Sequence, residues 1–137
     1  MTKMILGGIA AVLVALLAGF LWGASGRSTI ERALERAELR NELLEARSAA
    51  LAARTDIYNT NFGEASRHLE EARASVTRAA QRLEALDREE EMQLLQSAQG
   101  PIEEAQRLAS KLDLGANARA AEAVKTLESV LQTAGRP

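Results

Sequence analysis

Residues 59–64 read Asn-Thr-Asn-Phe-Gly-Glu and separate two long segments that carry regular apolar patterns. Asn61 followed by Glu64 three residues later is typical of the N-terminus of a helix. After this turn the apolar residues recur at alternating steps of four and three, which is a heptad stripe. The stripe contains Ala65, Leu69, Ala72, Val76, Ala79, Leu83 and Leu86. Because a short turn makes two helices antiparallel neighbours, the pattern predicts a helix over about 62–88 that packs against the helix before it.

The segment before the turn predicts a long, stalk-like helix over about 28–58. Ser28 and Glu31 have the spacing of a capping box, and no Pro or Gly follows them before Gly63. Two apolar seams run along this segment. The first contains Ile30, Leu34, Ala37, Asn41, Leu44, Ser48, Leu51, Thr55 and Tyr58, and the second contains Leu39, Leu43, Ala46, Ala50, Ala53 and Ile57. An apolar face of this width implies burial against two or more helices, which predicts a bundle.

Asn41 occupies an a-type position of the first seam. A buried Asn at such a position can set the register of a parallel coiled-coil dimer. The alternative is a polar residue on an exposed flank of the bundle, and we favour this alternative because polar residues on helices are mostly exposed.

The C-terminal part of the chain predicts two shorter helices. The charged run 87–91 interrupts the apolar pattern and reads either as a solvated helical segment or as a loop. Pro101 suits the first turn of a new helix over about 101–112. Gly115 reads as a left-handed residue at the end of that helix, and a last helix is predicted over about 116–134. The expected fold is therefore all-α, with an antiparallel bundle of about four helices.

A membrane anchor is predicted at the N-terminus. The run Met4–Trp22 has no charged or strongly polar side chain, and a helix of this length nearly crosses a hydrocarbon core of about 30 Å. Trp22 would lie at the membrane interface. The alternative is a signal peptide that is cleaved near Ser25. We favour a retained signal anchor over residues 1–26, because the apolar run exceeds the roughly 7–15 residues of a cleavable signal.

Small residues recur every fourth position along the predicted anchor, at Gly7, Ala11, Ala15, Gly19 and Gly23. Such a stripe lets two membrane helices approach closely, so it predicts a homodimer through the anchor. Gly and Ala are also simply common in membrane helices, which is the alternative explanation.

The orientation of the predicted anchor follows weakly from its flanking charges. Lys3 places the N-terminus in the cytoplasm, whereas Arg27 and Arg32 pull the other way. The balance slightly favours a periplasmic domain over residues 27–137. Arg outnumbers Lys and Ala is abundant, which favours a bacterial source and hence the inner membrane.

The composition excludes several classes of chemistry. The formal net charge of −2 offers no basic surface for nucleic acid, and the absence of Cys excludes thiolate chemistry and disulfides. The single histidine, His68, has Asp56, Glu64 and Glu71 as the nearest candidates for partners in a metal site, but such side chains are ordinary on an exposed helix surface. The sequence therefore predicts no catalytic residues, no cofactor and no metal.

The expected function is that of a membrane-tethered, non-enzymatic interaction or scaffold protein, which presents its bundle to a protein partner. Tyr58 and Phe62 flank the main turn, where they either pack the end of the hairpin or form a recognition spot. One alternative is a soluble helical adaptor or binding protein that is exported and released by signal cleavage. A second alternative is an enzyme subunit.

Overall fold

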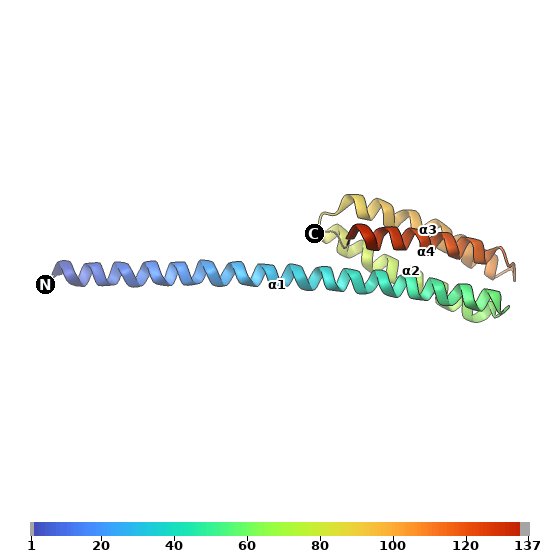
Figure 1. Cartoon of the computed structure of the whole chain (residues 1–137), viewed down its shortest axis with the longest axis horizontal. Helices are drawn as coiled ribbons and strands as arrows, with labels where there is room; N and C mark the ends of the chain where they lie inside the picture. The colour runs from blue at the N-terminus through green and yellow to red at the C-terminus, as the bar shows by residue number, and fades with distance from the viewer. Residues whose placement is uncertain (1, 135–137) are drawn as a thin grey trace. The chain divides into compact units, whose positions relative to one another are not determined.

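A computed structural model describes the backbone of residues 2–134 and the side chains of residues 29–134. Its described residues form four α-helices and the turns between them, with no strand (Figure 1). The helices are α1 (Thr2–Tyr58), α2 (Phe62–Ala85), α3 (Glu89–Ala109) and α4 (Ala116–Ala134). The prediction of an all-α fold is confirmed. The chain divides into two compact units, residues 1–36 and residues 37–137.

The unit formed by residues 37–137 is an antiparallel bundle of four helices. Its helices run up and down in chain order, so that the α1–α2 and α3–α4 turns lie at one end and the α2–α3 turn lies at the other (Figure 1). Each turn is short, which leaves consecutive helices side by side.

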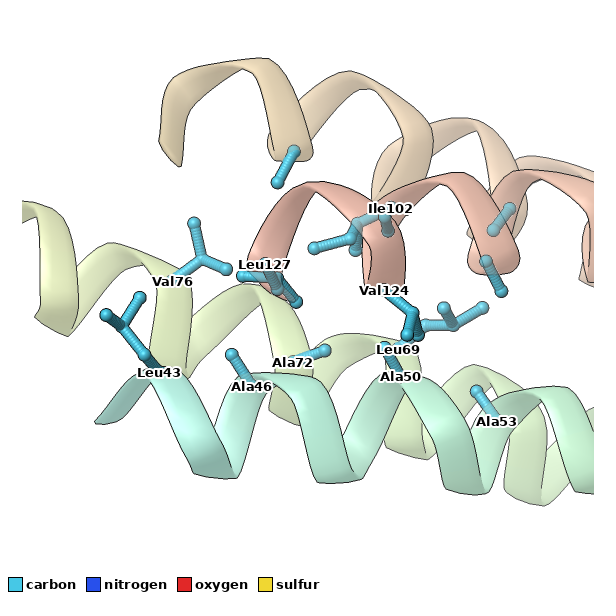
Figure 2. Close-up of a cluster of buried hydrophobic side chains, with 14 of the residues drawn as sticks. Leu43, Ala46, Ala50, Ala53, Leu69, Ala72, Val76, Ile102, Val124 and Leu127 are labelled. Carbon is cyan, nitrogen blue, oxygen red and sulfur yellow. The ribbon is translucent and has the colours of Figure 1, made fainter. Parts of the chain in front are cut away.

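One heptad stripe of each helix builds the core of the bundle (Figure 2). On α1 the buried stripe is the second seam, from Leu39 to Ile57, and the residues of the first seam lie on the outer face. The other stripes run over Ala65–Leu83, Leu95–Ala109 and Ala116–Val130. About half of the buried apolar residues are alanine. Small side chains shorten the distance between packed helices, so the helices lie close together around this core.

All three interhelical turns share one hydrogen-bond pattern and one unusual backbone conformation. In the first, the Asn61 amide donates to the Asp56 carbonyl and the Thr60 amide donates to the Ile57 carbonyl. This pair of bonds is the Schellman motif, which requires a left-handed residue after the helix. Thr60, Asp87 and Leu112 fill that place with φ of 58°, 53° and 57°. The prediction of Gly115 as the left-handed residue is wrong. The left-handed residue after α3 is Leu112, three positions earlier in the chain.

The predicted start of a helix at Pro101 is also wrong. Pro101 lies inside α3, which begins at Glu89 and ends at Ala109. Proline costs one backbone hydrogen bond, but the buried stripe continues across it from Ala98 to Ile102, and this burial keeps the helix in one piece. The charged run 87–91 is divided between the turn and the first residues of α3.

The long first helix also begins earlier than the sequence predicted. Ser28 lies within α1 rather than at its N-terminus, because the residues on both sides of it are helical. Met4–Trp22, Trp22 itself and the stripe from Gly7 to Gly23 lie outside the residues whose side chains are described. Among the described residues, no helix is both long enough and apolar enough to cross a membrane.

Candidate interaction surface

Two turns place exposed apolar side chains at one end of the bundle. Tyr58, the last residue of α1, is 80% exposed, while Leu112 and Leu114 in the α3–α4 turn are 69% and 59% exposed. Both turns lie at the same end of the bundle (Figure 1). We call Tyr58, Leu112 and Leu114 the bundle tip. Isolated exposed leucines are common on proteins, but three large apolar residues at one end form a candidate contact surface.

The α3–α4 turn is held in place by its own hydrogen bonds. Asp113 accepts a 2.8 Å hydrogen bond from the Gly115 amide through its Oδ1, which is how a side chain caps the start of a helix. The Asp113 amide in turn donates to the Leu108 carbonyl at 3.0 Å. This turn therefore presents Leu112 and Leu114 to solvent from a fixed backbone.

A shallow groove of about 330 Å³ lies beside the tip, between the end of α1 and the start of α4. Tyr58 lines it together with Leu51, Arg54, Thr55 and Asn117. The Arg54 Nε donates a 3.1 Å hydrogen bond to the Asn117 side-chain oxygen, which ties the two helices together below the tip. The groove gives the tip a polar border next to its exposed aromatic ring.

The structure separates the two aromatic residues that the sequence paired. Phe62 is partly buried and packs against the core, as one of the two predictions for it proposed, whereas Tyr58 is exposed. Leu112 was expected on the buried face of the predicted helix over about 101–112, which is wrong because α3 already ends at Ala109. Leu114 was missed because the Asp113-Leu114-Gly115 segment reads as an ordinary turn. The signal of both residues in the sequence is two leucines inside a connection that is otherwise polar and glycine-containing.

Ion pairs fix the position of α1 against α2. The Arg78 Nε donates to Glu42 Oε2 at 2.6 Å, and its Nη2 lies 3.1 Å from Glu45 Oε2. One turn further along, the Arg82 Nη1 lies 2.6 Å from Glu38 Oε2. The hydrogen bond to Glu42 is the main reason that the pKa of Arg78 is raised above its ordinary value. A shift of register by one turn would separate these partners.

A second contact of the same kind ties α1 to α4. Arg47 donates two hydrogen bonds to Glu128 Oε1, from Nε at 2.9 Å and from Nη2 at 2.7 Å. Both side chains are about two-fifths exposed, so solvent weakens the pair. The contact serves mainly to define which part of α4 faces α1.

His68 connects α1 and α2 at the side of the bundle. Its Nδ1 lies 3.1 Å from Glu71 Oε2 and its Nε2 lies 3.5 Å from Asp56 Oδ2, while Glu64 pairs with Arg67 instead. The hydrogen bond with His68 is the largest of the effects that lower the pKa of Glu71. Within the described part of the chain, no three acidic or histidine side chains are arranged to hold a metal ion.

Comparison with known proteins gives no relative: no family model, no curated protein and no solved structure matches the chain. The candidate surface is therefore defined by the structure alone.

Proposed function

We propose that this chain is a membrane-tethered, non-enzymatic helical interaction protein, which presents its bundle to a protein partner. In this proposal Met4–Trp22 is a retained signal anchor in the bacterial inner membrane, and the bundle tip is the surface that the partner contacts. The observation that carries the proposal is Leu112, a large apolar residue that is exposed and held in a left-handed backbone conformation.

Leu112 has two unfavourable features that a simple turn would avoid. A non-glycine residue in the left-handed region costs roughly 1–2 kcal/mol, and an exposed leucine leaves apolar area in contact with water. Both features are removed by glycine, the usual residue at this place of the motif. A partner that covers the side chain would remove the second cost and supports a binding role for the tip.

Site-specific photocrosslinking tests the tip directly. A photoreactive residue is introduced in full-length protein at Leu114, and a matched one at Gln93, an exposed residue of α3. Leu114 belongs to the bundle tip, whereas Gln93 lies outside it. We therefore expect the residue at position 114 to give a discrete protein adduct in intact cells and the residue at position 93 to give none. Equal adducts at both positions, or none at either, contradict the proposed surface.

A second experiment uses the double variant Leu112→Ser with Leu114→Ser, which changes the bundle tip and leaves Tyr58 in place. Both side chains are exposed, so the variant should fold with unchanged helicity by circular dichroism. We expect it to lose the partner recovered by affinity purification of the wild-type protein. Recovery at the wild-type level would show that the partner binds elsewhere.

The anchor has its own test, which also separates the main alternative. Mass spectrometry of the mature protein should find the intact N-terminus, and the protein should stay with membranes after an alkaline carbonate wash. A mature N-terminus at Gly26 would instead identify an exported adaptor that is released from the membrane.

A further inference from the structure

The outer face of α1 carries a second heptad seam that the other helices of the bundle leave largely exposed. In the bundle unit this outer seam consists of Ala37, Asn41, Leu44, Ser48, Leu51, Thr55 and Tyr58, of which only Leu51 is partly buried. At 3.6 residues per turn its residues lie almost opposite the buried stripe from Leu39 to Ile57. The α1 helix therefore has one face in the core and a second, regularly spaced face in solvent.

The large apolar residues of α1 that are exposed all follow this register among the residues whose side chains are described. Leu44 is 40% exposed and Tyr58 is 80% exposed, and both stand at d positions of the outer seam. Ile30 and Leu34, which belong to the other unit, continue the same spacing in the sequence and are 72% and 56% exposed. Apolar residues scattered at random over a helix surface would not keep a heptad register.

The charges that flank the outer seam are sorted by sign. The e positions next to the seam hold Glu31, Glu38 and Glu45, and the g positions from residue 40 onward hold Arg40, Arg47 and Arg54. In a parallel pair of helices each g residue faces the e residue of the following heptad on the partner. Arg40 then meets Glu45 of a second copy, twice in a symmetric dimer. In an antiparallel pair, e positions face e positions and g positions face g positions, so like charges would face each other instead.

The bundle leaves this particular pair accessible. Among the described residues Arg40 is exposed and has no ion pair, while Glu45 keeps a largely exposed side chain although it reaches Arg78. Arg47, by contrast, already binds Glu128. Asn41 lies at an a position of the seam, where a pair of asparagines favours a parallel, two-stranded arrangement in a single register.

We propose that the outer seam of α1 is a self-association surface, on which a second copy of this chain packs as a parallel two-stranded coiled coil. Leu44, Leu51 and Tyr58 form its apolar layers, Asn41 fixes its register, and Arg40 with Glu45 of the second copy fixes its orientation. Ser48 and Thr55 at the remaining a positions make the association weaker than that of an all-apolar seam. The outer seam shares Tyr58 with the bundle tip, whereas Leu112 and Leu114 of the tip lie outside the seam and remain for the proposed contact with a different protein.

Cysteine crosslinking tests the seam, because the native chain has no cysteine. Three single variants of the full-length protein are oxidised under mild conditions: Ser48→Cys and Thr55→Cys on the seam, and Ser129→Cys as a matched control. Ser129 is exposed on α4. In a parallel dimer both seam positions lie opposite their own copies at a distance that a disulfide can bridge. We expect covalent dimers for both seam variants and none for the control.

The crosslinks also distinguish the other arrangements. An antiparallel pair would crosslink through at most one of the two seam positions, and a monomer or a dimer joined elsewhere would crosslink through neither. Each of these results overturns the proposal. Crosslinking by Ser129→Cys at the level of the seam variants would mean random collision and would overturn it as well.

A charge reversal provides an independent test. In Arg40→Glu, the new carboxylate of each copy would face Glu45 of the other copy. Dimerisation measured by analytical ultracentrifugation should therefore weaken about tenfold. Lys125→Glu makes the same change of charge on the exposed surface of α4 and should leave dimerisation unchanged. Equal dimerisation of the two variants would contradict the parallel arrangement.

Discussion

Leu112, Thr60 and Asp87 show at the residue scale how this bundle turns without glycine. Each follows a helix in the left-handed conformation, with φ between 53° and 58°, and each turn is closed by the same two backbone hydrogen bonds. Steric repulsion between the side chain and the backbone makes this conformation costly for every residue but glycine. Some free energy of folding is therefore stored as strain in all three turns.

Relief of this strain gives a prediction that also bears on function. Thr60→Gly and Leu112→Gly should each raise the free energy of unfolding by about 0.5–1 kcal/mol, because the gain in the left-handed conformation exceeds the added freedom of the unfolded chain. Denaturant unfolding of the full-length protein measures the change. Only Leu112→Gly should also weaken binding of a partner at the tip. A loss of stability in both variants would mean that the turns are not strained.

Gly63 and Gly100, the two glycines inside helices of the unit 37–137, give a second comparison. A methyl group added at Gly63 or at Gly100 would meet no atom within 4 Å, so Gly63→Ala should stabilise the protein by up to about 1 kcal/mol through helix propensity. Gly100 precedes Pro101, and a side chain before proline disfavours the helical conformation. Gly100→Ala should therefore gain clearly less. Thermal unfolding of the two variants side by side decides the order.

At the scale of elements, spacing along the sequence predicted α2 and α4 within a few residues. Their single heptad stripes leave one choice of buried face, so the pattern alone fixes the core residues from Ala65 to Leu83. On α1, two seams of equal spacing compete, and the choice depends on which residues the other helices offer. The structure selects the seam with Leu39 and Ile57. Which of the two seams is buried depends on tertiary packing, so the sequence pattern of a single helix cannot predict it.

The bundle tip was not predicted from the sequence for a different reason. Turn residues are recognised by polar and flexible side chains, and this rule finds Asp113 and Gly115 but assigns no role to Leu114. Leu112 was assigned to the buried face of the predicted helix over about 101–112, because its spacing continues the apolar pattern of that helix. Exposure of Leu112 and Leu114 depends on how the turn is oriented against the bundle, which only the fold determines. The solvent exposure of Tyr58 likewise depends on the fold, because Tyr58 belongs to the first seam of α1 and the second seam is the buried one.

Pro101 gives a prediction at the element scale. Inside α3 it has no N–H to donate to the Ser97 carbonyl, and its ring crowds the preceding turn. Pro101→Ala should restore this bond and raise the free energy of unfolding by about 1–3 kcal/mol. Both Ser97 and Pro101 lie inside α3, so the local backbone is already helical and needs no rearrangement. A destabilised variant would show that the proline shapes the packing of α3.

At the scale of the whole molecule, the surface of the bundle carries several carboxylates whose contacts depend on pH. A hydrogen bond from Gln106 on α3, followed by one from Arg73, lowers the pKa of Glu70 on α2 below its ordinary value of 4.5. His68 lowers the pKa of Glu71 in the same way, and Arg107 lowers that of Glu104. These carboxylates are exposed, so each contributes modestly, but together they act on the same equilibrium.

The sign of their effect follows from linkage. A carboxylate with a lowered pKa in the folded state stabilises the fold above its ordinary pKa of 4.5, and this contribution is lost as the pH falls through the lowered value. The free energy of unfolding should therefore be level between about pH 7 and 5 and should fall progressively below that range. Denaturant unfolding at each pH measures the curve.

Glu70→Gln keeps the side-chain shape but cannot ionise, so its stability should fall less steeply with falling pH. Glu90→Gln is the control, because Glu90 is an exposed carboxylate with no ion pair in the described structure. This control should reproduce the wild-type slope. If both variants lose stability as steeply as the wild type, the contact between α2 and α3 through Glu70 does not contribute to acid sensitivity.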